Sequence, residues 1–342
     1  MVKRVMLKGT PTLEDVARVA GVSRATVSRV VNGTRNVDPQ LQETVRDAIE
    51  RTGYTPNHAA RSLVTRRTGT VALIISGAGG GSDVFVDPFF GRVTAGVVDF
   101  LRTRGVHPVL MLADTDRTRA EVVEFLRQGS ADGALLVTTH AAESLPDRLL
   151  EAGVPVVLYA RPGQPLPVSY VDLDHQAGGR LAAARFAEIG RTRVAAISGP
   201  LDVLASQDRL TGFRAALARN GFPYVPTVEG GFTATSGAVA MHRLLADHPE
   251  VDGVFAANDL MAQGAVDVLL AAGKRVPEDV AVVGFDDSAP AAACRPSLTT
   301  IRQPVEQMAA KMAEVLLTAL DDPEERPRSV IFEPELVLRA SA

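Results

Sequence analysis

The chain has 342 residues, more than one domain usually holds, so we expect at least two domains. Its formal net charge is −4, yet residues 1–67 carry 12 Lys and Arg against 6 Asp and Glu, which favours contact of this segment with an anionic polymer. No apolar run approaches the ~20 residues of a membrane span, and a single cysteine, Cys294, excludes an intramolecular disulfide.

Residues 1–11 are basic and show neither the apolar segment nor the cleavage site of a signal peptide. We therefore expect a mobile N-terminal arm on a cytoplasmic protein that has no membrane partner.

The segment from Thr12 to Asn32 predicts two short helices joined by a tight turn. Thr12 is a good N-cap for the first helix, with Asp15 three residues later, and Gly21 is suited to end that helix. Ser23 is suited to cap the second helix, whose valines fall on one face. Two short helices in this order are typical of a helix-turn-helix, whose second helix enters the major groove of DNA.

The outer face of the second helix carries residues suited to nucleic acid. Arginine can form paired hydrogen bonds to guanine, and hydroxyl groups suit phosphate oxygens. The residues predicted to meet DNA here are Ser23, Arg24, Ala25, Thr26, Ser28 and Arg29. An ordinary helical hairpin with a solvated basic face would show the same pattern. A third amphipathic helix, begun by Asp38-Pro39 and ended near Gly53, favours the DNA-binding interpretation.

A short potential helix follows Pro56, and a polar junction separates it from the remaining sequence. We expect a helix-turn-helix domain at 12–55, a hinge helix and linker at 56–67, and a core at 68–342.

The core alternates apolar, strand-like runs with helical patterns. Strands are predicted at 71–75, 109–112, 133–137, 154–159, 194–198, 253–257, 280–284 and 329–338. Helices are predicted at 90–103, 118–128, 176–189, 208–220, 235–245, 261–272 and 305–320. This alternation predicts α/β architecture, with parallel sheets covered by helices on both faces, in two Rossmann-like lobes. The first lobe is expected at about 68–172 and 303–324, and the second at about 173–302 and 325–342.

Open α/β sheets bind ligands beyond the carboxyl ends of their strands, so the cleft between the lobes is the expected effector site. The candidates at strand ends are Phe89, Phe90, Arg161, Arg209, Asn258 and Asp286. Arginine, amide and carboxylate groups beside an aromatic wall suit a polyhydroxylated ligand. Structural alternatives remain open: Asn258 or Asp259 can cap the helix at 261–272, and Asp286 can hold a loop.

Several motifs in residues 12–66 resemble the DNA-binding headpiece of the LacI/GalR (lactose repressor) family of bacterial transcription regulators. They are Thr12-Leu-x-Asp-Val-Ala, Ala20-Gly-Val-Ser, Thr26-Val-Ser-Arg-Val-Val-Asn32, and Gly53-Tyr-x-Pro-Asn57 followed by Ala59-Ala-x-x-Leu63. The core resembles the periplasmic-binding-protein-like core of the same family, so the resemblance covers nearly all of residues 12–340.

The resemblance implies roles for individual residues on DNA. Arg24, Ala25 and Arg29 would face base edges, and Leu63 would enter the minor groove as an apolar wedge. The residues near the sugar-phosphate backbone would be Ser23, Thr26, Ser28, Asn32 and Tyr54. The resemblance also places Thr12, Asn57 and Ala60 at the DNA.

The resemblance also implies a ligand between the lobes. In members that bind sugars, the positions of Arg209, Asn258 and Asp286 contact the ligand. This chain has Ala160 where many members carry a ligand-binding Asp, which weakens the sugar interpretation. Val203 and Ala205 stand where purine-binding relatives carry polar contacts, which disfavours a purine.

We therefore expect a sequence-specific DNA-binding repressor of sugar-utilisation genes that responds to a sugar effector. The alternative is the same scaffold responding to a nucleoside or another metabolite. Two headpieces on a near-palindromic operator require a homodimer, and the lack of a terminal heptad pattern argues against a tail-assembled tetramer.

We expect neither an enzyme nor a cofactor or metal, because the sequence shows no catalytic constellation, complete Gly-x-Gly-x-x-Gly motif or metal-ligand spacing. A secreted solute-binding protein would explain the core but not residues 12–63.

Overall fold

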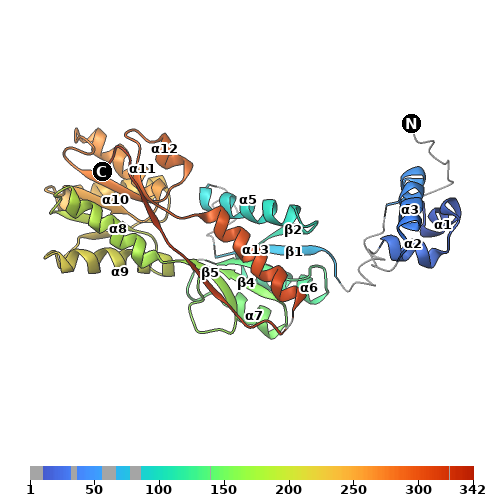
Figure 1. Ribbon diagram of the computed structural model, residues 1–342. Helices are drawn as coiled ribbons and strands as arrows, with labels where there is room; N and C mark the ends of the chain where they lie inside the picture. Colours follow the sequence, from blue (N-terminus) through green and yellow to red (C-terminus); the bar gives the residue numbers. More distant parts are fainter. Residues whose placement is uncertain (1–10, 32–36, 56–66, 78–85, 139, 323) are drawn as a thin grey trace. The chain divides into compact units, whose positions relative to one another are not determined.

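The computed structural model describes residues 11–31, 37–55, 67–77, 86–138, 140–322 and 324–342. The chain divides into two compact units, Met1–Gly69 and Thr70–Ala342 (Figure 1). None of the helices in these described ranges has the length and apolar character that crossing a membrane requires.

The first unit, here called the headpiece, contains three helices around a small apolar core. They are α1 (Leu13–Ala20), α2 (Arg24–Val31) and α3 (Pro39–Thr52). The buried side chains are Val16, Ala17, Val27, Val45, Ala48 and Tyr54. Each helix contributes to this core. Because the valines of α2 pack into the core, the opposite face of α2 is turned outward.

Local signals in the sequence start and stop these helices as predicted. Thr12 and Asp15 form a reciprocal capping box at α1, which ends at Gly21 with φ of 68°. The Ser23 hydroxyl accepts the amide of Thr26 at 3.1 Å at the start of α2. Asp38 caps α3, which ends at a left-handed Gly53.

The second unit, here called the core, consists of two lobes, each built on a six-stranded sheet. In the first lobe the strand order is β11-β5-β4-β3-β1-β2, and in the second it is β12-β10-β9-β8-β6-β7. All pairs are parallel except β10 with β12. The predicted two-lobed α/β architecture is confirmed.

The first lobe contains β1 (Thr70–Ser76), α5 (Pro88–Arg102), β2 (His107–Ala113), α6 (Asp116–Arg127), β3 (Ala134–Thr138), α7 (Leu145–Glu151), β4 (Val156–Tyr159), β5 (Ser169–Leu173), α13 (Val305–Asp321) and β11 (Ser329–Phe332). Figure 1 shows α5 and α13 together over one face of its sheet. Alternate β1 residues face opposite ways: Leu73 packs in the cluster that contains α5 and α13 residues, and Ile74 in the cluster that contains α6 and α7 residues.

The second lobe contains α8 (His175–Glu188), β6 (Val194–Ser198), α9 (Leu204–Arg219), β7 (Thr227–Glu229), α10 (Ala234–Asp247), β8 (Gly253–Ala256), α11 (Asp259–Ala271), β9 (Ala281–Asp286), α12 (Ala289–Ala293), β10 (Thr299–Arg302) and β12 (Glu335–Val337). Apolar residues of α8 and α9 share one core cluster, and those of α10 and α11 share another.

Glycines bring α8 and α9 unusually close. A Cβ on Gly179 would collide with the carbonyl oxygen of Arg209, and a Cβ on Gly212 would collide with that of Gln176. This close approach allows the side chain of Arg209, on α9, to reach His175 at the start of α8.

The chain crosses between the lobes three times. The crossovers lie between β5 and α8, between β10 and α13, and between β11 and β12. The predicted single strand at 329–338 is therefore two strands that belong to different sheets. Pro334, which lacks an N–H group for a strand ladder, lies between them. The last crossing falls between Phe332 and Glu335, later than the predicted boundary at 325.

Other short elements escaped prediction, namely α7, β5, β7, α12 and β10. Each has only three to seven residues, too few to show a periodic pattern that differs from a loop.

Candidate DNA-binding surface and effector cleft

The outer face of α2 presents the side chains that the sequence predicted for it. Ser23, Arg24, Ala25 and Arg29 are exposed, and Thr26 and Ser28 are half-buried. Nε of Arg24 lies 3.0 Å from Oε1 of Glu14, and both side chains are largely exposed. An exposed pair of this kind contributes little to stability, so it can be exchanged for a contact with DNA.

Two predicted DNA contacts have structural roles within the headpiece. The Thr12 hydroxyl donates to Asp15 Oδ2 at 2.8 Å and accepts the Asp15 amide, completing the cap of α1. Tyr54 is only 9% exposed and packs in the headpiece core. The other predicted contacts, Asn32, Asn57, Ala60 and Leu63, lie outside the described residues.

A cavity of about 360 Å³ lies between the two lobes of the core. Its lining includes all six residues predicted for an effector site, which are Phe89, Phe90, Arg161, Arg209, Asn258 and Asp286. They come from the carboxyl ends of strands or from the first two turns of the following helices. The topological rule for open α/β sheets therefore located the cleft correctly.

Arg209 is the central cation of the cleft and is only 6% exposed. Its guanidinium donates to His175 Nδ1 at 3.2 Å, to the Ala257 carbonyl at 2.5 Å and to Gln303 Oε1 at 3.1 Å. It also lies 3.7 Å above the centre of the Phe285 ring. These contacts hold the guanidinium in one orientation before any ligand arrives.

His175 supports Arg209 as a neutral acceptor. Burial lowers the pKa of His175, and the positive charge of Arg209 lowers it further. Because Nδ1 accepts the bond from Arg209, the ring proton lies on Nε2, which faces Asp172 Oδ1 at 3.4 Å. The imidazole therefore links a carboxylate of the first lobe to the arginine of the second.

Asp286 faces Arg209 in a strained conformation. Its Oδ1 lies 3.5 Å from Nη2 of Arg209 and has no hydrogen-bond partner among the described residues. Its φ of 102° lies in a region that L residues rarely occupy. Its backbone carbonyl accepts a bond from Arg92 at 2.8 Å. An under-satisfied carboxylate held in a strained backbone at a cleft is a candidate ligand contact.

Asn258 fulfils the structural alternative that the sequence left open. Its Oδ1 accepts the amide of Met261 at 2.9 Å as the N-cap of α11, and its Nδ2 donates to the Phe232 carbonyl at 2.9 Å. The side chain also lines the cavity, so a ligand contact would add to its capping role.

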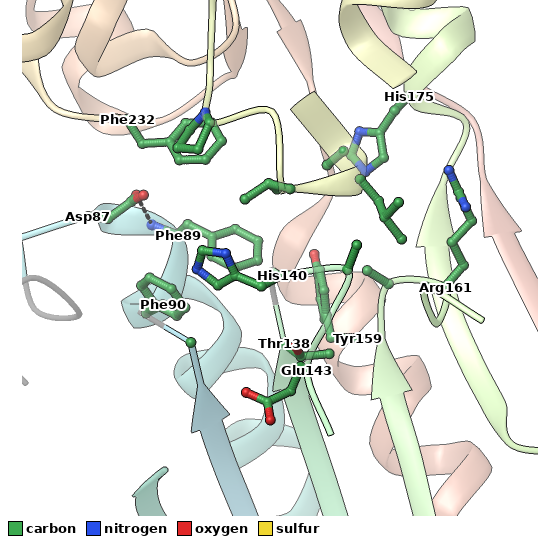
Figure 2. A pocket seen from close by; sticks show the side chains of 18 of the residues that line it. Asp87, Phe89, Phe90, Thr138, His140, Glu143, Tyr159, Arg161, His175 and Phe232 are labelled. Carbon is green, nitrogen blue, oxygen red and sulfur yellow. Dashed lines mark hydrogen bonds between the residues drawn. The ribbon is translucent and has the colours of Figure 1, made fainter. Parts of the chain in front are cut away.

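Aromatic rings line both sides of the cleft (Figure 2). The ring of Phe89 lies edge-on to Phe90 at 5.2 Å and to Tyr159 at 5.3 Å between centres. Phe232 belongs to the second lobe, and its side chain was not predicted to line the site. Apolar ring faces of this kind can pack against the C–H faces of a sugar.

Besides the bond from Arg92 to the Asp286 carbonyl, further bridges join the lobes across the cleft. Arg161 Nη2 lies 2.5 Å from Asp208 Oδ2 in α9, so this predicted ligand residue is paired with the second lobe. Away from the crossovers, the loops after β3 and β6 also meet. His140 Nδ1 lies 2.6 Å from Asp202 Oδ2, and the Ala141 amide donates to the Asp202 carbonyl at 2.9 Å. The structure therefore holds the two lobes in contact on both sides of the cavity.

Asp87 carries an unusual carboxyl group in the cleft. Burial raises the pKa of Asp87 from 3.8 to about 6, and the nearby Asp286 carboxylate acts in the same direction. The Phe89 amide, which Asp87 accepts as the N-cap of α5, and Arg209 oppose this shift. The group therefore titrates near neutral pH.

We predict that Asp87→Asn raises the melting temperature at pH 7.5. The folded chain binds the Asp87 proton more tightly than the unfolded chain does. The contribution of this proton to the free energy of unfolding is therefore complete below about pH 3.8 and is lost as the pH rises through about 6. At pH 7.5 the free energy of unfolding of the variant should exceed that of the wild-type chain by at most about 3 kcal/mol. Asparagine preserves the helix cap.

Thermal unfolding of both proteins from pH 5 to pH 8 measures this difference, which should shrink toward pH 5. Equal melting temperatures at pH 7.5 would contradict the raised pKa.

Several cleft residues were not predicted, among them Asp87, His140, Tyr159, His175, Phe232 and Gln303. The strand-end rule would have found His175 if β5 had been recognised, because it follows that strand by two residues. Within the described ranges, no cluster of three His, Cys, Asp or Glu side chains is arranged to hold a metal ion.

Comparisons with known proteins agree with this architecture. The family of bacterial regulatory proteins named lacI matches residues 12–57, and a periplasmic binding protein-like domain matches residues 183–342. A transcriptional regulator named CelR from Thermobifida fusca is 45% identical, covering 97% of this chain and 98% of its own. The ribose operon repressor of Escherichia coli K12 is 34% identical, covering 97% and 99%.

Solved structures give the same result. A complex of CelR with cellobiose superposes with a TM-score of 0.77 at 43% identity, covering 97% of this chain and 100% of the other. The lac repressor dimer bound to operator and an anti-inducer superposes with a TM-score of 0.83 at 25% identity, covering 97% and 99%.

A helix-turn-helix headpiece joined to a two-lobed core defines a DNA-binding transcription regulator, not an enzyme. The chain belongs to the LacI family of bacterial regulatory proteins.

Proposed function

We propose that this regulator represses sugar-utilisation genes and that a glucose-containing disaccharide in the cleft releases it from its operator. The observation that carries the proposal is the pair of buried Arg209 and half-buried Asp286, which lines the cavity between the lobes together with aromatic side chains. Its fixed donors and under-satisfied acceptor suit neighbouring hydroxyl groups of a neutral ligand.

Cellobiose is the first ligand to test, because the CelR structure in the comparison is a complex with that sugar. The cavity is lined by polar residues such as Arg209 and by apolar residues such as Val203 and Leu166. This combination suits a sugar, which offers both hydroxyl groups and C–H faces. A purine is disfavoured because Val203 and Ala205 offer no side-chain hydrogen bonds to a base.

DNA recognition is proposed to use α2 in the major groove, with Arg24, Ala25 and Arg29 toward the bases. Ser23, Thr26 and Ser28 would approach phosphates. One short helix offers few contacts, so we propose a homodimer on a near-palindromic operator in the cytoplasm. The hinge predicted at 56–67, most of which lies outside the described residues, would join the two recognition events.

We predict that cellobiose releases the protein from its operator. An operator selected from random DNA would be bound in an electrophoretic mobility assay and titrated with cellobiose, glucose and hypoxanthine at constant salt. Cellobiose should weaken binding at least about tenfold, within the usual range of allosteric coupling. Hypoxanthine is the control and should have no effect. Release by hypoxanthine and not by any sugar would contradict the proposal.

A further inference from the structure

The guanidinium of Arg209 is held by side chains from two of the three crossovers. Its Nε donates to Nδ1 of His175, the first residue of α8 after the first crossover. Its Nη2 donates to Oε1 of Gln303, which lies in the second crossover, between β10 and α13. The remaining bond, to the carbonyl of Ala257, comes from the second lobe itself. The cation at the centre of the cleft is therefore tied to the segments about which the lobes must rotate.

Gln303 extends this connection into the first lobe. Its Nε2 donates to the hydroxyl of Tyr159 at 3.0 Å, at the end of β4. That hydroxyl also lies 3.5 Å from Sδ of Met308 in α13. Gln303 is 1% exposed and Tyr159 is 3% exposed, so water has little access to replace a broken bond. One amide thus joins a second-lobe cation to a first-lobe hydroxyl.

We propose that Gln303 and Tyr159 are positioning residues that couple ligand contact at Arg209 to the relative rotation of the lobes. This inference rests on the proposed function. Nη2 of Arg209 carries two N–H groups, and Oε1 of Gln303 takes only one of them. A ligand hydroxyl that bonds both Nη2 and the nearby Asp286 carboxylate draws the guanidinium toward Asp286 and stretches its bond to Gln303. Leaving a buried amide unpaired is costly, so the displaced Gln303 and its Tyr159 partner move together. The second crossover moves with them because Gln303 is part of it.

The test compares operator affinity with and without saturating cellobiose, because the ratio of the two dissociation constants measures coupling. The variants are Gln303→Leu, Tyr159→Phe and the double substitution. Each single variant should reduce the ratio by about tenfold or more, while operator affinity without cellobiose stays close to that of the wild-type chain. The double variant should be no worse than either single variant, because both remove the same bridge.

Two further variants separate coupling from simple loss of packing. Gln303→Glu keeps an acceptor for Arg209 and can accept a hydrogen bond from the Tyr159 hydroxyl, so it should retain the ratio. Gln207→Leu is the matched control, because Gln207 lies exposed on α9 and its side chain donates to the nearby Leu201 carbonyl at 2.6 Å. It should leave the ratio unchanged.

A purely structural role would lower the melting temperature and leave the ratio intact, and that result would overturn the proposal. Additive losses in the double variant would also overturn it. If Gln303→Leu fails to fold, Tyr159→Phe decides the question, since it removes a single oxygen atom.

A wild-type chain that ignores cellobiose would instead count against the proposed function. Hydrogen exchange of the ligand-free protein then tests the coupling independently. Both single variants should exchange the amides of β5 and β10 faster than the wild-type chain does, and unchanged exchange would overturn the inference.

Discussion

Replacing Arg209 by alanine is expected to abolish the response to effector while the protein still binds its operator. The guanidinium supplies buried cationic donors to the cleft, and each hydrogen bond from a charged donor to the effector contributes about 1.5–3 kcal/mol, so loss of two costs about 3 kcal/mol or more. Effector affinity should therefore fall about a hundredfold or more. Operator binding should persist because the headpiece is a separate compact unit. Calorimetric titration of the effector and mobility assays of the operator measure the two properties.

Two companion variants make this result interpretable. Removing Arg209 leaves the nearby Asp286 carboxylate without its counter-charge, which lowers stability. Asp286→Asn removes that charge and preserves the shape of the side chain, so it should also lose the response without unfolding. Arg214→Ala is the matched control, since this exposed arginine lies on the same helix and its side chain donates to the Thr227 hydroxyl at 2.8 Å, away from the cavity lining. A normal effector response in the Arg209 and Asp286 variants would refute their assignment to the ligand.

Replacing Arg24 by alanine is expected to change which operator sequence the protein prefers. Arg24 is exposed at the start of α2, and its contact with Glu14 leaves most of the side chain accessible. A bidentate arginine contact discriminates against the wrong base by about tenfold to a hundredfold. The variant should lose that discrimination at one base pair of each half-site and retain it elsewhere. Selection from random DNA at fixed salt measures the preference position by position.

Arg18→Ala is a suitable comparison for Arg24→Ala. Arg18 is equally exposed, but it lies on α1 and pairs with Asp15. It should leave the base preference unchanged. If Arg24→Ala instead weakens binding to all sequences by the same factor, Arg24 contacts phosphate and does not read a base.

Much of the headpiece could be predicted because its signals are local. The cap formed by Thr12 and Asp15, the left-handed turn at Gly21 and the valines of α2 all act within a few residues of one another. Helical periodicity then decides which side chains face outward. The packing of Tyr54 in the core was not indicated by the sequence, and its contact with the DNA backbone stays a prediction.

The cleft was predictable in location and not in detail. The alternation of strands and helices, together with the strand-end rule, placed the six predicted residues around one cavity. Short elements such as β5 and β10 gave no periodic signal, so the residues that follow them, His175 and Gln303, were missed. Their side chains nonetheless hold the arginine that the sequence did identify.

The sequence by itself determined the class of protein, the outward face of α2 and six of the residues that line the cleft, because capping, periodicity and strand order are written in neighbouring positions. Only the tertiary structure decided what those cleft residues contact. Arg209 meets partners 34 and 94 residues away, and Gln303 meets a hydroxyl 144 residues away. Such contacts depend on how distant elements pack, including the close approach of α8 and α9 at Gly179 and Gly212. The pairing of Arg161 with Asp208 was hidden for the same reason.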